Sequence, residues 1–284
     1  MTPHILGSKP VVEAMNANLH PRVELLRQKG VIPTLAIVRV GNKPDDISYE
    51  RTAIKRAESL DIAVRVFELP EDATYELIAH TIEFINEDPS IHGCLMFRPL
   101  PEVFDEKALC DLLVLHKDVD GISTAALAGI FTDDPDSLPP ATAEACIKVL
   151  DHYDISLEGK HVVVVGRSLV IGKPVSMMLL RHNASVTICH SKTENLASIT
   201  RNADIVICAT GRARAYGADY FVPGQVVLDV GINFDAEGHM CGDVDFEAVE
   251  PLVAAITPVP GGIGSVTTSC TMEHTIVSAE RAAL

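Results

Sequence analysis

A run of proline and glycine near the C-terminus is the first feature whose residues could shape a chemical site. Residues 257–267 read Thr-Pro-Val-Pro-Gly-Gly-Ile-Gly-Ser-Val-Thr, with two prolines, three glycines and three hydroxyl side chains. Proline fixes φ and removes a hydrogen-bond donor, whereas glycine lets the backbone approach a ligand closely. The pattern predicts a loop that lines a binding site, rather than a helix or a central strand. An ordinary turn rich in proline and glycine is the alternative.

A second candidate is the turn at residues 166–174, which follows the β-branched run 162–165 and opens into a helical pattern. At such a turn, free backbone N–H groups and the positive end of the helix favour the pyrophosphate of a dinucleotide. The spacing differs from a GxGxxG motif, because Ser168 takes the place of the second glycine. A plain strand-to-helix turn is therefore the alternative, but the strands that follow in order favour a nucleotide site.

Charges near this turn indicate which dinucleotide would bind. A site specific for NAD often has a carboxylate at the end of its second strand, where it holds the ribose 2′-hydroxyl. Here that strand ends Cys-His-Ser-Lys-Thr at residues 189–193, and the first carboxylate is Glu194. Lys192 and Arg167 suit a 2′-phosphate, so the sequence favours NADP, with NAD as the alternative. The opposing interpretation is that both cations are solvated surface charges.

An alternation of apolar runs and helical patterns must position these candidates, and it is typical of an α/β protein with parallel strands. In the second half, four valine-rich strands with short helical crossovers predict a Rossmann-type domain. The last helix follows the run of proline and glycine, so it can return to the first half. The predicted strands are residues 33–40, 63–69, 93–97, 160–166, 185–189, 205–209 and 226–230, and the predicted helices are residues 47–60, 74–86, 143–152, 174–181, 193–201 and 271–283.

The length of 284 residues suits two domains, and the apolar content of 47% is ordinary for a soluble globular enzyme. We expect a substrate domain formed by residues 1–145 with 265–284. A Rossmann-type nucleotide-binding domain would occupy residues 146–264.

Charge and cysteine usage exclude several classes of function. A formal net charge of −16 argues against nonspecific binding to nucleic acid or to an anionic membrane, since both require a basic surface. The seven cysteines lie far apart without metal-ligand spacing, so we expect reduced buried thiols and no metal site. No leader pattern and no apolar run of membrane-spanning length is present. These features predict a cytoplasmic protein.

With these features in place, the chain resembles the methylenetetrahydrofolate dehydrogenase/cyclohydrolase family over nearly its full length. The matching segments, in order, are Val40-Gly41 with Pro44 and Tyr49, Pro99-Leu100-Pro101, Lys117-Asp118-Val119-Asp120-Gly121, Val165-Gly166-Arg167-Ser168 with Gly172 and Pro174, His190-Ser191-Lys192-Thr193, Asp229-Val230-Gly231-Ile232-Asn233 and the loop 258–264. The resemblance implies two α/β domains with a cleft between them, assembled as a homodimer through the nucleotide domains. The implied dehydrogenase passes a hydride from 5,10-methylenetetrahydrofolate to NADP or NAD. The implied cyclohydrolase then hydrolyses the methenyl product to 10-formyltetrahydrofolate.

The resemblance also implies roles for individual residues. Asp120 would accept hydrogen bonds from the pterin ring, because one carboxylate matches the paired donors of a 2-amino-pyrimidinone edge. Tyr49 would lie near the reacting carbon. Without the resemblance, a turn is the commoner role for Asp120 and helix packing is the commoner role for Tyr49. The other implied folate-site residues are Phe97, Pro99, Leu100, Pro260, Gly261 and Gly262, and the implied cofactor-site residues are Gly166, Arg167, Ser168, Gly172, His190, Ser191, Thr210, Gly211, Gly231 and Ile232.

Two departures from the family pattern concern the hydrolysis step. The family has Tyr-x-x-x-Lys, which puts both side chains on one helix face, but the corresponding residue here is Ala53. Lys55 would lie about 240° around the helix from the tyrosine, and Arg56 nearly two turns beyond it. The family also has Gln-Leu-Pro-Leu-Pro at the strand end, where this chain places Phe97 instead of the glutamine. Asp46 stands where a serine is common.

These losses affect the two reactions differently. Hydride removal from an N–CH₂–N carbon leaves an amidinium cation stabilised by both nitrogens, so the protein mainly aligns the reactants. Hydrolysis needs an activated water and a proton transfer. We therefore predict a dehydrogenase with weak or absent cyclohydrolase activity. The alternatives are a bifunctional enzyme in which Arg98, Arg56 or Lys55 supplies the cation, a binding protein without catalysis, and a hydride-transfer enzyme with another substrate.

Overall fold

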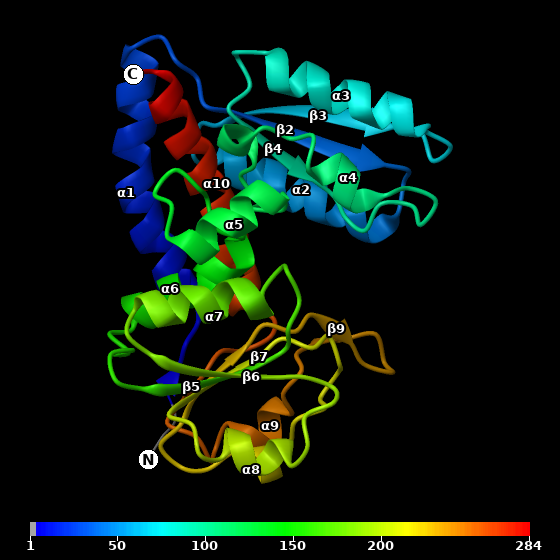
Figure 1. The fold of residues 1–284 in the computed structure, drawn as a ribbon. Coiled ribbons are helices and arrows are strands. Elements are labelled where there is room, and N and C mark those ends of the chain that lie inside the picture. The colour runs from blue at the N-terminus through cyan, green and yellow to red at the C-terminus, as the bar shows by residue number, and fades with distance from the viewer. Residues whose placement is uncertain (1–3) are drawn as a thin grey trace. The chain divides into compact units, whose positions relative to one another are not determined.

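The structure, a computed structural model, describes residues 4–284 and forms two compact units (Figure 1). Unit 1 holds the chain up to Val12 together with Thr142–Thr267, and unit 2 holds Glu13–Ala141 together with Thr268–Leu284. The predicted boundaries at residues 145 and 265 lie within a few residues of these divisions. Residues 4–12, however, belong to unit 1 rather than to the half in which we expected them, because a strand at His4–Ile5 joins the sheet of unit 1.

Unit 1 is built on six parallel strands in the order β1-β11-β8-β7-β5-β6. Their β-branched side chains are mostly buried, which suits strands covered on both faces and confirms the predicted α/β class with a Rossmann-type parallel sheet. The bounds are β1 His4–Ile5, β5 His161–Val165, β6 Ser185–Cys189, β7 Ile205–Cys208, β8 Val226–Asp229 and β11 Ala255–Ile256.

The strand order of unit 1 marks where a ligand should bind. The chain runs from β5 to β6 on one side and then to β7 on the other side of β5. In open parallel sheets, ligands bind outside the carboxyl ends of the strands at such a reversal. Gly166 and Ala209, which follow β5 and β7, lie at this edge.

The helices of unit 1 are short. The predicted helix at residues 193–201 is reduced to α8, because Asn195 adopts the left-handed conformation at φ 54° directly before it. The elements are α7 Gly172–Arg181, α8 Leu196–Thr200, α9 Phe246–Val249, a 3₁₀ turn at Ala218–Tyr220 and an antiparallel hairpin of β9 Asn233–Phe234 with β10 Met240–Cys241.

Unit 2 is built on three parallel strands in the order β3-β2-β4. They are β2 Thr34–Val40, β3 Ala63–Leu69 and β4 Gly93–Met96. Figure 1 shows α2 (Pro44–Glu58) and α3 (Tyr75–Glu87) on opposite faces of this sheet. The isoleucines of α3 pack with alternate residues of β2, as expected from the two-residue period of a strand. The other helices within unit 2 are α4 Glu106–Cys110 and α5 Thr124–Thr132, with a 3₁₀ turn at Leu115–Lys117. Helix α6 Ala141–His152 belongs to unit 1 except for its first residue, and α1 Ser8–Gln28 and α10 Ile263–Ala282 have residues in both units.

The prediction that all of residues 257–267 form a loop is wrong in its second half. Helix α10 begins at Ile263, so only residues 257–262 form the loop. Both prolines and the left-handed Gly261, at φ 100°, precede this point. The five residues after Gly262 contain only one glycine, which a helix tolerates. Within residues 4–284, every helix is too short or too polar to cross a membrane.

Candidate functional site

The first group of predicted site residues lies at the carboxyl end of β4 in unit 2. The backbone N–H of Phe97 extends the sheet by donating to the carbonyl of Val38 at 2.9 Å. The turn that follows is held by the backbone N–H of Leu100, which donates to Oε2 of Glu106 at 2.7 Å. Glu106 begins α4, so this short helix fixes the turn. Phe97, Pro99 and Leu100 therefore share one turn after β4.

Tyr49 from α2 packs against Phe97 at this edge. The ring centroids are 5.4 Å apart and the ring planes are tilted by 49°, a favourable aromatic arrangement. Burial raises the pKa of Tyr49 to about 12; the charge of Asp120 acts in the same direction, and a hydrogen bond with Thr268 opposes both. The phenol is therefore a neutral hydrogen-bonding group at neutral pH, and it does not act as a base.

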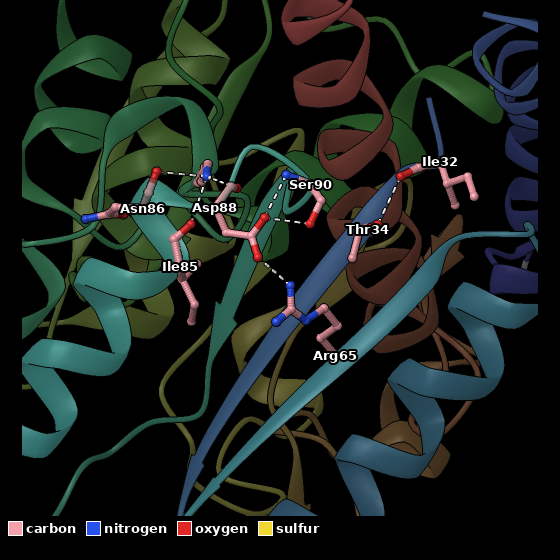
Figure 2. A network of polar contacts seen from close by, with 8 residues as sticks. Ile32, Thr34, Arg65, Ile85, Asn86, Asp88 and Ser90 are labelled. Carbon is pink, nitrogen blue, oxygen red and sulfur yellow. Dashed lines mark hydrogen bonds and ion pairs between the residues drawn. The ribbon is translucent and has the colours of Figure 1, made fainter. Parts of the chain in front are cut away.

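The loop that carries Asp120 begins with a buried lysine. Nζ of Lys117 donates to the backbone carbonyls of Ile85, Asn86 and Asp88 at 2.8, 2.9 and 2.7 Å. Figure 2 labels these three acceptor residues. These carbonyls belong to the end of α3 and the residue after it, where the last C=O groups of a helix lack partners within the helix. A cation at this end also suits the helix dipole. Lys117 therefore ties the start of the loop to α3.

The end of α3 is itself fixed by Asp88, as Figure 2 shows. Ser90 donates to Oδ1 of Asp88 from its backbone N–H at 2.9 Å and from its hydroxyl at 2.6 Å. Nη1 of Arg65, on β3, donates to Oδ2 at 2.5 Å. The hydrogen bonds of Ser90, followed by that of Arg65, lower the pKa of Asp88 to about 2. The anchor of Lys117 is thereby connected to the sheet.

Two further residues shape this loop around Asp120. The carboxylate of Asp118, which is fully buried, accepts from the backbone N–H groups of Ile122 at 3.0 Å and Ser123 at 2.8 Å. Gly121 has φ 63°, and a Cβ at this position would lie 2.5 Å from the backbone nitrogen of Pro140. Only glycine fits there, because it accepts positive φ and has no side chain.

The carboxyl group of Asp120 has an unusual protonation equilibrium. Burial raises the pKa of Asp120 to about 6; the charge of Arg98 opposes this, Asp118 acts with burial, and His274 opposes it weakly. Nδ1 of His274, on α10, donates to the carbonyl of Val119 at 2.8 Å, which holds the loop from its other side. The Asp120 carboxylate is 22% exposed, and Arg98 approaches it at 3.9 Å. The structure thus gathers Tyr49, Phe97 and Asp120 in one region of unit 2.

The three candidate replacements for the missing lysine occupy different surroundings. Ala53, at the family's lysine position, is fully buried. Lys55 is exposed on α2. Arg56 is half-buried and committed to other partners, because Nε donates to Oγ of Ser269 at 3.1 Å and Nη2 donates to Asn16. Only Arg98 lies against the Asp120 carboxylate.

In unit 1, the turn after β5 is packed tightly against the end of β7. A Cβ on Gly166 would lie 2.3 Å from the carbonyl oxygen of Ala209, and a Cβ on Gly172 would lie 2.3 Å from that of Gly166. Arg167 and Ser168 lie between these glycines and are exposed. The close backbone packing, the exposed cation and hydroxyl, and the start of α7 fit a phosphate-bearing dinucleotide.

The segment after β6 forms a small hydrogen-bonded turn. The backbone N–H of His190 donates to Oγ1 of Thr193 at 2.8 Å, and the backbone N–H of Lys192 donates to Nδ1 of His190 at 3.2 Å. Ser191 and Lys192 are exposed in this turn. A hydroxyl and a cation are therefore presented together after the second strand, with no carboxylate beside them before Glu194.

Asp243 supports the remaining cofactor loops, and the sequence analysis missed it. Its fully buried carboxylate accepts from the backbone N–H groups of Thr210 at 2.5 Å, Gly211 at 3.2 Å and Arg212 at 2.8 Å. It also accepts from the hydroxyl of Thr210 at 3.0 Å and from Nδ2 of Asn233 at 3.0 Å. This one side chain fixes the segment after β7 to the hairpin that follows Gly231.

Asp229 forms a second layer beneath Asp243. Its carboxylate accepts from the backbone N–H groups of Gly231 at 3.1 Å, Asp243 at 2.9 Å and Val244 at 2.8 Å. Burial raises the pKa of Asp229 to about 7, and the three backbone hydrogen bonds oppose this. Gly242 is required here, since a Cβ would lie 1.9 Å from Oδ2 of Asp229. The sequence signal for this role of Asp229 was its position, because it is an aspartate at the end of an apolar strand.

The loop 257–262 joins this scaffold at its base. Oγ1 of Thr257 accepts from the backbone N–H of Asp229 at 2.8 Å. The carbonyl of Gly261 accepts from the backbone N–H of Ser8 at 2.7 Å, while Pro260 and Gly261 are exposed. Across residues 4–284, no group of His, Cys, Asp or Glu side chains is arranged to hold a metal ion.

Comparison with known proteins identifies the class of this two-unit chain. The catalytic domain of the tetrahydrofolate dehydrogenase/cyclohydrolase family matches residues 6–120, and the NAD(P)-binding domain of the same family matches residues 140–283. The chain therefore belongs to the tetrahydrofolate dehydrogenase/cyclohydrolase family.

Individual relatives agree with this assignment. "Bifunctional protein FolD" of Carboxydothermus hydrogenoformans is 49% identical over 277 residues, which cover 97% of this chain and 96% of the relative. The bifunctional enzyme FolD of Campylobacter jejuni has a solved structure with a TM-score of 0.95, 34% identity and 98% coverage of both chains. The Trypanosoma brucei methylenetetrahydrofolate dehydrogenase-cyclohydrolase has been solved with NADP and an inhibitor. Its structure matches this chain with a TM-score of 0.93 and 30% identity, and the match covers 98% of both chains. The predicted membership of this family of NAD(P)-dependent methylenetetrahydrofolate dehydrogenases is confirmed, and so is the predicted dinucleotide-binding domain.

Proposed function

We propose that this chain oxidises 5,10-methylenetetrahydrofolate to 5,10-methenyltetrahydrofolate with NADP, and that Asp120 and Tyr49 bind the folate in unit 2. The observation that carries the proposal is the Asp120 carboxylate. It lies near Tyr49, which packs against Phe97, and it makes no hydrogen bond within residues 4–284. Such a carboxylate is available to accept the two donors of a pterin ring.

The geometry suits a reaction that needs alignment more than proton transfer. Removal of a hydride from the N–CH₂–N carbon leaves a cation that the two ring nitrogens stabilise, so no base is required. The neutral Tyr49 phenol and the Phe97 ring offer surfaces against which the reacting carbon can be held. NADP supplies the hydride acceptor when it is bound. In unit 1, Arg167 and Ser191 would hold its 2′-phosphate, and the loops on Asp243 would hold the rest.

Hydrolysis of the methenyl product is a second candidate activity. The name of the Carboxydothermus hydrogenoformans relative, a bifunctional protein, supports it better than the weak or absent cyclohydrolase that the sequence analysis predicts. The pocket residues argue the other way, because Ala53 is a buried alanine at the lysine position and Phe97 replaces the amide. If hydrolysis occurs, Asp120, with its pKa near 6, is the titratable group best placed to move a proton.

A paired assay of the purified protein tests both activities. NADPH absorbance after addition of methylenetetrahydrofolate reports hydride transfer, and the decay of the methenyl product reports hydrolysis. Hydride transfer should be rapid with the unmodified protein. No hydride transfer with either NADP or NAD would contradict the proposed function. Hydrolysis as fast as hydride transfer would establish the bifunctional alternative.

A restoring variant shows whether the two family side chains are what hydrolysis lacks. Ala53→Lys with Phe97→Gln should raise methenyl hydrolysis, since each general acid–base group contributes about 10²–10⁴-fold. Ala53→Lys alone should give less, because the Phe97 ring still occupies the place of the amide. Lys55→Ala is the matched control, since it removes an exposed cation of the same helix. If the unmodified protein hydrolyses the methenyl product and Lys55→Ala does not, Lys55 is the cation that replaces the family's lysine.

We also propose a homodimer that forms through unit 1, in the cytoplasm. Strand β6 is an edge of the described sheet, and Ile188 on it is 38% exposed. An edge strand with exposed apolar side chains is a surface that pairs readily with another chain. Light scattering after size exclusion measures the mass, and a monomer at micromolar concentration would contradict this assembly.

A further inference from the structure

Arg98 occupies a position that the roles above leave unexplained. It follows Phe97 after β4, and its guanidinium lies between two carboxylates. Nη1 is 3.6 Å from Oε1 of Glu106, and Nη2 is 3.9 Å from Oδ2 of Asp120. Both distances exceed the roughly 2.7–3.2 Å of an N–H···O hydrogen bond. The guanidinium therefore lies between two carboxylates and forms a hydrogen bond with neither.

One N–H of this guanidinium is also buried without a partner. Nε of Arg98 has no hydrogen-bond partner within residues 4–284, and the side chain is 21% exposed. Buried donors are almost always satisfied in native proteins, because an unsatisfied one is costly. Nη2 of the same guanidinium faces Asp120 at 3.9 Å, so an acceptor on a ligand beside Asp120 would meet a cationic donor there.

The substrate of the proposed function carries such an acceptor. The pyrimidinone edge of a reduced folate presents the 2-amino group and N3–H as donors, and the 4-oxo oxygen directly beside them as an acceptor. The ionised Asp120 carboxylate can only accept, so it cannot serve the oxygen. We propose that Arg98 completes the recognition of this edge by donating to the 4-oxo oxygen, while Asp120 accepts from the two neighbouring donors. This inference rests on the proposed function.

This role differs from replacement of the missing lysine. A guanidinium remains protonated under physiological conditions, so it cannot pass a proton between water and a ring nitrogen. It can orient a planar ring edge, because its donors have a fixed fork geometry. Arg98 is thus a substrate-binding residue of this chain, and its loss should act on folate affinity rather than on a hydrolytic step.

The charges around Asp120 provide a second observable. Arg98 faces Asp120 from the end of β4, Asp118 from its own loop, His274 from α10 and Tyr49 from α2. Burial raises the pKa of Asp120, and Arg98 opposes that rise more than the other groups do. Removing Arg98 should therefore move the loss of folate binding on acidification to a higher pH.

Calorimetric binding of tetrahydrofolate to the full chain tests the inference. Arg98→Gln should weaken binding about tenfold or more, because the hydrogen bond involves a charge. Its pH midpoint should rise by about one pH unit, the usual lower bound for an Arg–Asp pair. Arg98→Lys, which keeps the charge but loses the fork, should fall between wild type and Arg98→Gln. The NADP dissociation constant, which depends on unit 1, should not change.

Matched outcomes separate this inference from the proposed function. Lys107→Gln removes a cation that is 72% exposed on the neighbouring helix, and it should leave tetrahydrofolate binding as it is. Wild-type affinity and an unchanged pH midpoint in Arg98→Gln would overturn the inference alone. A wild-type protein that does not bind tetrahydrofolate would overturn both this inference and the proposed function. If Arg98→Gln does not fold, Arg98→Lys decides, and wild-type affinity in that variant would overturn the inference.

Discussion

Two carboxylates, Asp243 in unit 1 and Asp120 in unit 2, are used in opposite ways. In unit 1, Asp243 accepts five hydrogen bonds, three of them from consecutive backbone N–H groups at residues 210–212. In unit 2, Asp120 makes no hydrogen bond within residues 4–284, and Arg98 approaches it only at 3.9 Å. The first carboxylate has no capacity left for a ligand, whereas the second has nearly all of it. A committed carboxylate builds a loop, and an uncommitted one is available for a substrate.

The difference has an energetic consequence for each unit. A buried carboxylate that accepts several backbone N–H groups stabilises the ionised form, so its hydrogen bonds contribute to folding. Burial makes the ionised form of a carboxylate costly, and it raises the pKa of Asp120 to about 6. Functional sites often retain unfavourable groups of this kind, because the ligand supplies the missing partners.

Asp243→Asn should produce the largest effect, and it should be on stability. An amide at this position keeps one acceptor and turns an NH₂ group toward backbone donors at residues 210–212. We expect the free energy of unfolding to fall by about 3 kcal/mol, as for other broken buried networks. Chemical denaturation measures this loss. NADP binding should weaken as well, because the loop that begins at Thr210 loses its support.

Asp245→Asn is the matched control for this prediction. Its side chain lies two residues further on and makes no capping hydrogen bond to α9. Its unfolding free energy should stay within about 0.5 kcal/mol of wild type. Equal destabilisation by both variants would mean that Asp243 contributes only as a charge of this segment.

Asp120→Asn should have nearly as large an effect, but on activity. Asparagine cannot accept from both pterin donors, and we expect kcat/KM for methylenetetrahydrofolate to fall about 100-fold. Stability should move the other way. The folded carboxyl group holds its proton more strongly than the unfolded one, so ionisation at pH 7 opposes folding and the neutral amide relieves this by about 1 kcal/mol or more. If Asp120→Asn has unchanged turnover, or loses as much stability as Asp243→Asn, the proposed contrast between Asp120 and Asp243 is wrong.

The sequence was sufficient to predict four of the six strands of unit 1, because these four are short β-branched runs with no competing pattern, whereas the two-residue strands β1 and β11 were not predicted. The positions of β5, β6, β7 and β8 agree with prediction to within a residue at each end. Helix α10 was harder, because two glycines directly follow the prolines and a third lies at Gly264, so composition could not show that the chain becomes helical at Ile263. The first long helix, α1, was not predicted; it contains Pro21 in its interior.

Site residues could be predicted only where they lie in a sequence segment that is recognisable as part of a family pattern. Tyr49, Phe97 and Asp120 lie far apart in sequence, and the resemblance to a family was needed to group them. Asp243 and Lys117 act through hydrogen bonds to backbone groups of other segments. No spacing rule encodes such partners, because they are set by the fold and not by neighbouring residues.

Arg167→Ala should have a smaller effect, confined to one cofactor. If Arg167 contacts the 2′-phosphate, its loss removes a charge-assisted hydrogen bond that NAD never makes, so the NADP dissociation constant should rise about tenfold. The NAD dissociation constant should change much less. Arg201→Ala, which removes an exposed cation at the end of α8, is the control. Equal weakening of both cofactors would place Arg167 on the pyrophosphate or the turn instead.

The pH dependence of the folate KM should show the smallest effect, and it addresses the uncommitted carboxylate directly. Asp120 must be ionised to accept from both pterin donors, and its pKa is about 6 because burial outweighs the charge of Arg98. Lowering the pH from 7.5 to 5.5 should leave roughly a quarter of the carboxyl groups ionised, so KM should rise about fourfold. The direction follows from the ionised form being the binding form. Asp120→Asn has no such titration, and its weaker binding should be flat over the same range. If the wild-type KM is also independent of pH over this range, the Asp120 carboxylate accepts hydrogen bonds from the protein in solution, as Asp243 does. The contrast between Asp120 and Asp243 would then be wrong.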